Sequence, residues 1–249
     1  MLSGGIFCAT QLVAQSSDKP GAKERAARTF QAARARYNRE MDSAEAAWQF
    51  ARACFDWAEL ATNTAQRAET GYLGIAAGRR AVTLDPKLAA AHYYLAMNLG
   101  ELAQTKTLGA LKMIDEIERE FKAAWDLDAR FDYAGPERNL GLLYLNAPGW
   151  PMSIGNRNKA RQHLQKTVEL SPDYPDGWLS LLEAELKWGE KRSVQSKLSV
   201  VEKVMATART KLAGDDWELS WADWDSRWEK IKSKAGETVK PLESPKQRN

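Results

Sequence analysis

Two similar helix-ending phrases, each with leucine two residues before a proline, occur in this chain. Each follows the same spacing of small and apolar residues. The copies are residues 83–86 (TLDP) and 169–172 (ELSP). Proline cannot continue an α-helix, so each copy predicts a helix that stops at the same point of a repeated unit. The residues ahead of the two prolines fall at steps of four, three and five, and they are Gly74, Gly78, Ala81 and Pro86 in one copy and Ala160, Leu164, Thr167 and Pro172 in the other.

A second helical pattern alternates with the first and predicts the partner helix of each unit. It combines large apolar residues with a leucine and a small residue at helical spacing, as in His92, Leu95, Ala96 and Leu99, in Leu140, Gly141 and Tyr144, and in Trp178, Leu181 and Leu182. Two such helices in a period of about 34 residues are typical of the tetratricopeptide repeat, or TPR. Such units stack because none buries its apolar face alone. We therefore predict an all-α fold, a TPR-like helical-hairpin solenoid with a concave groove.

The chain divides into five segments by composition and helical spacing. Residues 1–15 are weakly apolar and are predicted to be the remnant of a signal peptide, and residues 16–42 a linker or loose helix. The TPR-like repeat domain is predicted over residues 43–212. A Trp-rich C-terminal capping helix is predicted over 213–233, followed by a disordered basic tail at 234–249.

The capping helix is indicated by four tryptophans, Trp217, Trp221, Trp224 and Trp228, at steps of four, three and four. This spacing places them on one helical face. We expect the face to close the last repeat. A docking surface is the alternative, because tryptophan is enriched where proteins bind partners.

Composition argues against several classes of function. The 36 basic and 33 acidic residues leave a net charge of +3, which does not predict nucleic-acid binding. No apolar run approaches the roughly 20 residues that span a bilayer. His92 and His163 are isolated, without cysteine or carboxylate at metal-ligand spacing, and no catalytic set is evident. The sequence therefore predicts no enzyme, no metal site and no cofactor.

Two insertions, residues 103–112 and 146–156, interrupt the repeats. We expect binding residues near the concave face and in these two loops. Arg138 starts a helix, where a cation opposes the helix dipole, so we expect it to face a carboxylate or an anion. One hypothesis is a pocket for a small organic anion, with Arg138 binding the charge and Trp150 covering the rest. In the alternative, Trp150 folds back as a plug and Arg138 pairs with Asp132. The candidate binding residues are Tyr93, Asn98, Lys106, Tyr133, Arg138, Tyr144 and Trp150.

Three stretches resemble a known family, the T-components of TRAP transporters, which are TPR-like proteins of bacterial cell envelopes. The stretches are residues 91–111, 127–151 and 158–170, and the most specific phrase is DYAGP at 132–136. The resemblance implies a periplasmic accessory of a tripartite transporter that depends on a substrate-binding protein. It implies a solute-binding protein as partner, a small organic ligand, and a chain that can form a homo-oligomer.

The leading hypothesis is thus an exported, periplasmic TPR-like binding protein that assists solute uptake. The alternative is a generic TPR scaffold of the cell envelope that binds other proteins and has no transport role. Export rests on residues 1–15 being a signal, and a cytoplasmic location is expected if they are not.

Overall fold

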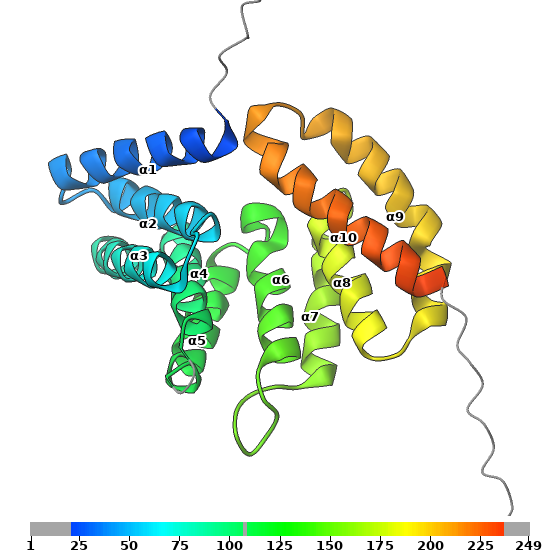
Figure 1. The fold of residues 1–249 in the computed structure, drawn as a ribbon. Helices are drawn as coiled ribbons and strands as arrows, with labels where there is room; N and C mark the ends of the chain where they lie inside the picture. Colours follow the sequence, from blue (N-terminus) through cyan, green and yellow to red (C-terminus); the bar gives the residue numbers. More distant parts are fainter. Residues whose placement is uncertain (1–20, 107–108, 237–249) are drawn as a thin grey trace, which may run out of the picture.

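The protein folds into helical hairpins stacked side by side (Figure 1). The structure is a computed structural model that describes residues 21–106 and 109–236. In these ranges the helices are α1 (Ala22–Arg39), α2 (Ala44–Glu59), α3 (Thr64–Leu84), α4 (Ala89–Gln104), α5 (Leu111–Leu127), α6 (Phe131–Asn146), α7 (Arg157–Leu170), α8 (Pro175–Lys187), α9 (Lys191–Lys211), the short 3-10 helix η1 (Asp215–Trp217) and α10 (Glu218–Gly236). The fold is all-α and TPR-like, as predicted.

Four hairpins form the solenoid: α2 with α3, α4 with α5, α6 with α7, and α8 with α9. From α4 onward, each first helix also packs on a helix of the preceding hairpin. The predicted phrases end α3 and α7, and Pro86 and Pro172 stand just beyond them. Within the described ranges, strand-like pairing is limited to an isolated bridge between Gly149 and Gly155.

Small residues lie where neighbouring helices cross, both within a hairpin and between successive hairpins. A Cβ added to Gly141 of α6 would lie 2.7 Å from Cγ of Leu164 on α7. A Cβ at Gly78 of α3 would lie 3.0 Å from Cα of Leu95 on α4. Larger side chains at these positions would separate the helices, so the two glycines set the packing distance here.

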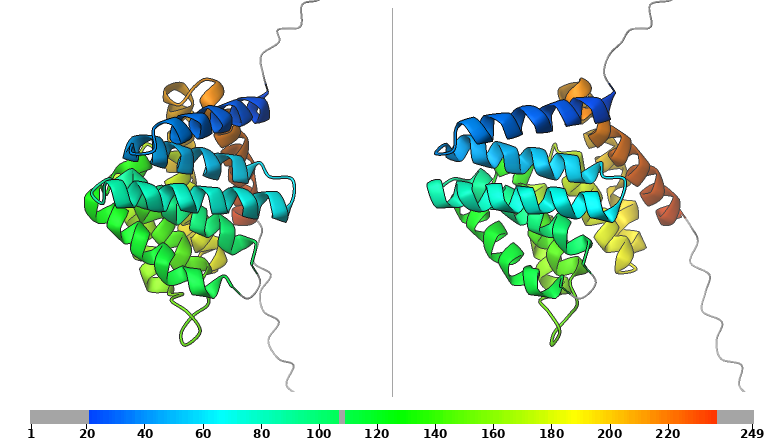
Figure 2. Two further views of the ribbon diagram at one scale, coloured as in Figure 1. Left: turned by 90° about the vertical axis from the view of Figure 1, so that its left-hand side faces the viewer. Right: turned by 60° about the vertical axis from the view of Figure 1, so that its left-hand side comes forward.

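Residues 22–39, expected as a linker or loose helix, form α1 against the first hairpin. Phe30 is buried, and its ring lies 5.7 Å from that of Phe50 and 6.2 Å from that of Trp57. Arg25 forms an ion pair with Glu218, so the start of α1 meets the start of α10 (Figures 1 and 2). The predicted signal remnant at 1–15 lies outside the described residues, as does most of the predicted tail.

The predicted Trp-rich capping helix is η1 followed by α10, and it closes the last hairpin. Trp221, Trp224 and Trp228 are buried against α8 and α9. The indole of Trp221 donates a hydrogen bond of 2.7 Å to the carbonyl of Leu212. Trp217 stays half-buried and contacts another part of the molecule, described below.

Candidate functional site

The most unusual backbone in the described chain lies at the start of α6. Three successive residues, Asp132, Tyr133 and Ala134, have φ values of 48°, 56° and 60°. This left-handed conformation costs a residue with a side chain roughly 1–2 kcal/mol, and non-glycine residues usually adopt it singly. The right-handed part of α6 follows, so the phrase DYAGP forms a left-handed turn joined to a helix.

Contacts from α4 and from α6 itself hold this turn. The hydroxyl of Tyr93 donates a 2.7 Å hydrogen bond to Oδ2 of Asp132 and accepts one of 3.1 Å from Asn139. Asn139 also donates to the carbonyl of Gly135 at 2.9 Å. A Cβ at Gly135 would lie 2.6 Å from the Tyr93 hydroxyl oxygen, so only glycine lets the two helices approach this closely.

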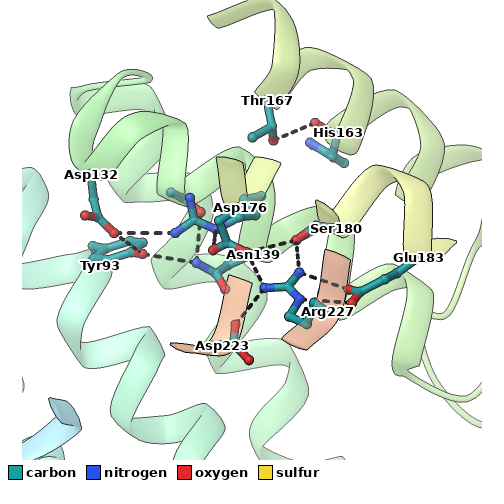
Figure 3. Close-up of polar contacts among 12 residues, drawn as sticks. Tyr93, Asp132, Asn139, His163, Thr167, Asp176, Ser180, Glu183, Asp223 and Arg227 are labelled. Atoms are coloured by element: carbon teal, nitrogen blue, oxygen red, sulfur yellow. Dashed lines mark hydrogen bonds and ion pairs between the residues drawn. The ribbon is translucent and has the colours of Figure 1, made fainter. Parts of the chain in front are cut away.

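Arg138 joins the turn to the capping helix through a buried ion network; Figure 3 shows its partners Asp132 and Asp176 together with Arg227. Its guanidinium lies 3.0 Å from Oδ2 of Asp176 on α8 and 3.5 Å from Oδ2 of Asp132. Arg227 of α10 contacts the other oxygen of Asp176 at 2.6 Å and Glu183 at 2.9 Å. The network therefore links α6, α8 and α10 through one shared carboxylate.

The charges of this network stabilise one another. Burial alone would raise the pKa of Asp176, but Arg138 and Arg227 outweigh it and hold that pKa below its ordinary value. Burial likewise opposes the charge of Arg138, yet the carboxylate of Asp176 raises its pKa above the usual range. One nitrogen of Arg138, Nη1, is buried without a hydrogen-bond partner. Arg138 is thus a structural cation and not one presented to solvent.

The turn presents an aromatic side chain outward. Tyr133 is 41% exposed, and one face of its ring stacks on Tyr174 at 4.2 Å with the planes 5° apart. The ring of Trp217, from η1, stands nearly perpendicular to it at 6.1 Å. Tyr174 is buried and packs on Trp224. A flat, solvent-accessible aromatic surface therefore rests on a rigid base.

Two charged side chains of α2, Arg52 and Asp56, lie close enough to Asp132 in the turn to interact with it electrostatically. Arg52 and Asp56 form an ion pair of 3.7 Å, and each stays about half exposed, at 57% and 47% of its side chain. Partial shielding from water raises the pKa of Asp56; the nearby Arg52 lowers it, and the nearby carboxylate of Asp132 adds to the increase. We call Arg52, Asp56, Asp132, Tyr133 and Trp217 the inner patch.

Four of the predicted binding residues take structural roles. Tyr93 and Tyr144 are buried, and the Tyr144 hydroxyl donates to Glu118. Asn98 is fully buried and donates hydrogen bonds to the carbonyls of Ala51 at 2.8 Å and Tyr94 at 2.7 Å, which joins α4 to α2. Arg138 belongs to the ion network. These four side chains hold helices together.

The remaining three lie on the surface at separate places. Tyr133 belongs to the inner patch, whereas Lys106 donates a 2.9 Å hydrogen bond to the hydroxyl of Tyr72. Trp150 is 89% exposed in the loop between α6 and α7. The seven candidates therefore do not form one site.

The pocket hypothesised between Arg138 and Trp150 is not formed. Arg138 lies in the middle of α6 and its guanidinium is directed at Asp132 and Asp176, whereas Trp150 lies in the loop beyond the last residue of α6, Asn146. The alternative pairing of Arg138 with Asp132 is confirmed, and it is supplemented by Asp176. The plug role expected for Trp150 in that alternative is wrong, because the side chain points into solvent.

Sequence reasoning missed Asp176, Arg227, Asn139 and the two α2 residues of the inner patch. Asn139 directly follows Arg138 next to the DYAGP phrase, and Asp176 stands in the first turn of a predicted helix, so both positions carried a weak signal. Arg227 lies between tryptophans of the cap. Nothing in the spacing indicated that these residues, from separate hairpins, would meet.

Other kinds of site are not evident in the described ranges. His, Cys, Asp and Glu side chains there do not gather in threes that could hold a metal ion. Among the described helices, none has the length and apolar character needed to span a bilayer.

Stacked hairpins with small residues at their crossings and a terminal cap define a TPR-like helical solenoid. Among solved structures, TTC0263, a thermophilic TPR protein of Thermus thermophilus, matches with a TM-score of 0.59 at 16% identity, over 84% of this chain and 91% of that one. The MamA protein matches with a TM-score of 0.43 at 15% identity, over 76% of this chain and 94% of its own. The first likeness shows the fold.

A family model described as Regulator of microtubule dynamics protein 1-3 matches residues 11–129. The match includes α1 to α5 and ends just before the left-handed turn, so of the inner patch it covers only Arg52 and Asp56. A search of curated proteins gave no match.

Proposed function

We propose that this chain is a non-catalytic interaction scaffold that binds a segment of a partner protein on the inner patch. A TPR-like solenoid supports a role in protein interaction, because such repeats present extended surfaces to their partners. The match to a family described as a regulator agrees with a role without catalysis. The observation that carries the proposal is the left-handed turn at Asp132–Ala134 with Tyr133 exposed on it.

Backbone strain of this kind persists only where the surroundings impose it, and it clusters at functional positions. Here the Tyr93 hydroxyl, the packing of Gly135 on Tyr93 and the Arg138 network all act to impose it. A right-handed start to the helix would avoid the cost but would redirect Tyr133. The strained turn therefore holds the ring of Tyr133 flat against Tyr174 and open to solvent.

The chemistry of the inner patch defines the segment that it suits. Tyr133 and Trp217 offer aromatic surface, which contributes strongly to interfaces. Asp56 is paired with Arg52 and Asp132 with Arg138, so the patch offers charges of both signs beside its aromatic rings. We expect the partner segment to combine an apolar or aromatic residue with polar or charged ones.

The test is to capture partners with the purified chain and then measure the affinity of one identified partner by calorimetry. Tyr133→Ala should weaken binding by about tenfold or more, since central aromatic residues of interfaces contribute about 1.4 kcal/mol or above. Tyr72→Ala, which removes an equally accessible tyrosine from α3, is the matched control and should leave the affinity unchanged. Equal affinities for both variants would refute binding at the inner patch.

The hypothesis of an accessory role in solute uptake remains a second candidate, supported by the phrase DYAGP that forms the turn. Under it the partner is a solute-binding protein. A neighbouring gene pair for a transporter membrane subunit and a solute-binding protein would support this hypothesis. Capture of partners unrelated to transport would favour the generic scaffold.

A further inference from the structure

The loop between α6 and α7, residues 147–156, projects away from the helices (Figures 1 and 2) and carries two large, exposed apolar side chains. Trp150 is 89% exposed and Met152 is 68% exposed. Pro151 lies between them, and we call Trp150–Met152 the tip. An exposed tryptophan beside an exposed methionine gains free energy when an apolar phase removes both from water.

Backbone hydrogen bonds hold the loop in one shape. The amide of Gly155 donates to the carbonyl of Pro148 at 2.8 Å, and the amide of Met152 donates to that of Gly149 at 3.1 Å. The amide of Asn156 donates to the carbonyl of Tyr144 at 2.9 Å, which ties the loop to α6. Ile154 packs on the core. These contacts therefore fix the loop in a shape that leaves the tip outside the packed helices.

Basic side chains surround the base of the loop. Lys187 of α8 contacts Oδ1 of Asn146 at 3.1 Å, and Arg157 opens α7 with about half of its side chain exposed. Lys159 lies 4.9 Å above the ring of Tyr144. Between Glu137 and Glu169 the sequence contains no aspartate or glutamate. The basic residues of the loop base are Arg157, Lys159, Arg161 and Lys187.

Three carboxylates from other elements lie near this base, and each already has a basic partner; for Glu185, which acts on Arg161, that partner is Lys197. Glu190 lies 2.6 Å from Arg157 and 2.6 Å from Arg161, and these hydrogen bonds, that of Arg161 first, lower its pKa to about 2. Glu118 is bonded to Lys122 and to the hydroxyl of Tyr144. The four basic residues of the loop base, together with Lys122 and Lys197, outnumber these three carboxylates, so the loop base keeps a net positive charge.

We propose that the tip inserts into the interface of an anionic membrane, with the basic base of the loop held against the lipid headgroups. Tryptophan favours the boundary between headgroups and acyl chains. Basic side chains near an anionic bilayer each add about 1 kcal/mol. A narrow apolar tip above a base of net positive charge fits the surface of an anionic bilayer.

The test is sedimentation of the full chain with vesicles of phosphatidylcholine alone and with vesicles that also contain phosphatidylserine. We expect binding to the second kind. We expect Trp150→Ala/Met152→Ala to lower the partition coefficient by about tenfold, since each 1.4 kcal/mol of lost burial is a factor of ten. Met41→Ala is the matched control, because Met41 is also 68% exposed and lies between α1 and α2.

A second readout locates the inserted residue. In a Cys8→Ser background, Met152→Cys carries an environment-sensitive dye, while Cys54 stays buried and unlabelled. The dye emission should shift to the blue with phosphatidylserine vesicles, and a dye on Met41→Cys should not respond. Absence of vesicle binding, as expected of a tip that docks on a protein, would overturn the proposal. Equal binding by the tip variant and the wild type would overturn it too.

Discussion

The hydroxyl of Tyr93 on α4 holds Asp132 on α6 in a left-handed conformation by a hydrogen bond of 2.7 Å. Tyr93→Phe removes this bond and the one accepted from Asn139. We expect a loss of about 1–3 kcal/mol in the free energy of unfolding, because buried polar partners are left unpaired. Denaturation in urea measures it. Tyr94→Phe is the control, since its hydroxyl bonds neither residue; equal losses for both variants would contradict the role of Tyr93.

Gly141 sets the distance between α6 and α7. Gly141→Leu should cost about 1–3 kcal/mol or more, because its Cβ alone would lie 2.7 Å from Cγ of Leu164. Gly100→Ala in α4 is the opposite case: nothing lies within 4 Å of an added Cβ there. That change should raise stability by about 0.4–1 kcal/mol. Thermal melting of the two variants measures the expected loss of stability for Gly141→Leu and the expected gain for Gly100→Ala. An unchanged melting temperature for Gly141→Leu would refute the close contact of α6 with α7 at Gly141.

Removing Arg138 should destabilise the fold, because its guanidinium lies at the centre of the buried ion network. The change removes a buried cation, so that Arg227 alone remains to balance the carboxylate of Asp176. Breaking a buried ion network from one side costs about 3–5 kcal/mol. Arg157→Ala, on a half-exposed side chain, should change stability by less than about 0.5 kcal/mol. If urea denaturation gave similar values for both, the network would be dispensable.

Glu101 should make stability depend on pH. Burial raises its pKa to about 7, and the carboxylate of Glu59 adds to this while Arg67 opposes it. The folded state therefore holds a proton that the unfolded state releases near pH 4.3, so stability falls as the pH rises from about 4.3 to 7. Glu101→Gln stays neutral and should raise the melting temperature at pH 8 more than at pH 5. An equal effect at both pH values would contradict the raised pKa.

The solenoid could be predicted from the sequence because its determinants are local and periodic. The phrases at 83–86 and 169–172 end helices, Gly141 allows a close crossing, and the tryptophan spacing places one face of α10 on the last hairpin. Each of these features acts within one hairpin or its neighbour. A pattern of small and large residues is sufficient to specify such packing.

The inner patch could not be predicted in the same way. Asp132, Tyr133 and Ala134 have ordinary right-handed preferences, and their left-handed turn is imposed by Tyr93 from another hairpin. The partners of Arg138 depend on which helix faces come together, which periodicity does not specify. Trp150 was expected to be covered because it is apolar, but the loop bonds hold it exposed.

Site-specific photo-crosslinking tests the central claim, that partners bind on the inner patch, most directly. A benzophenone amino acid replaces Tyr133 in one variant and Tyr72, an exposed residue of α3, in another, and both are irradiated in the cells that produce the chain. The account predicts a discrete crosslinked protein at position 133, absent at position 72, whose yield falls when Trp217→Ala is added. Crosslinks at position 72 with none at position 133 would contradict it.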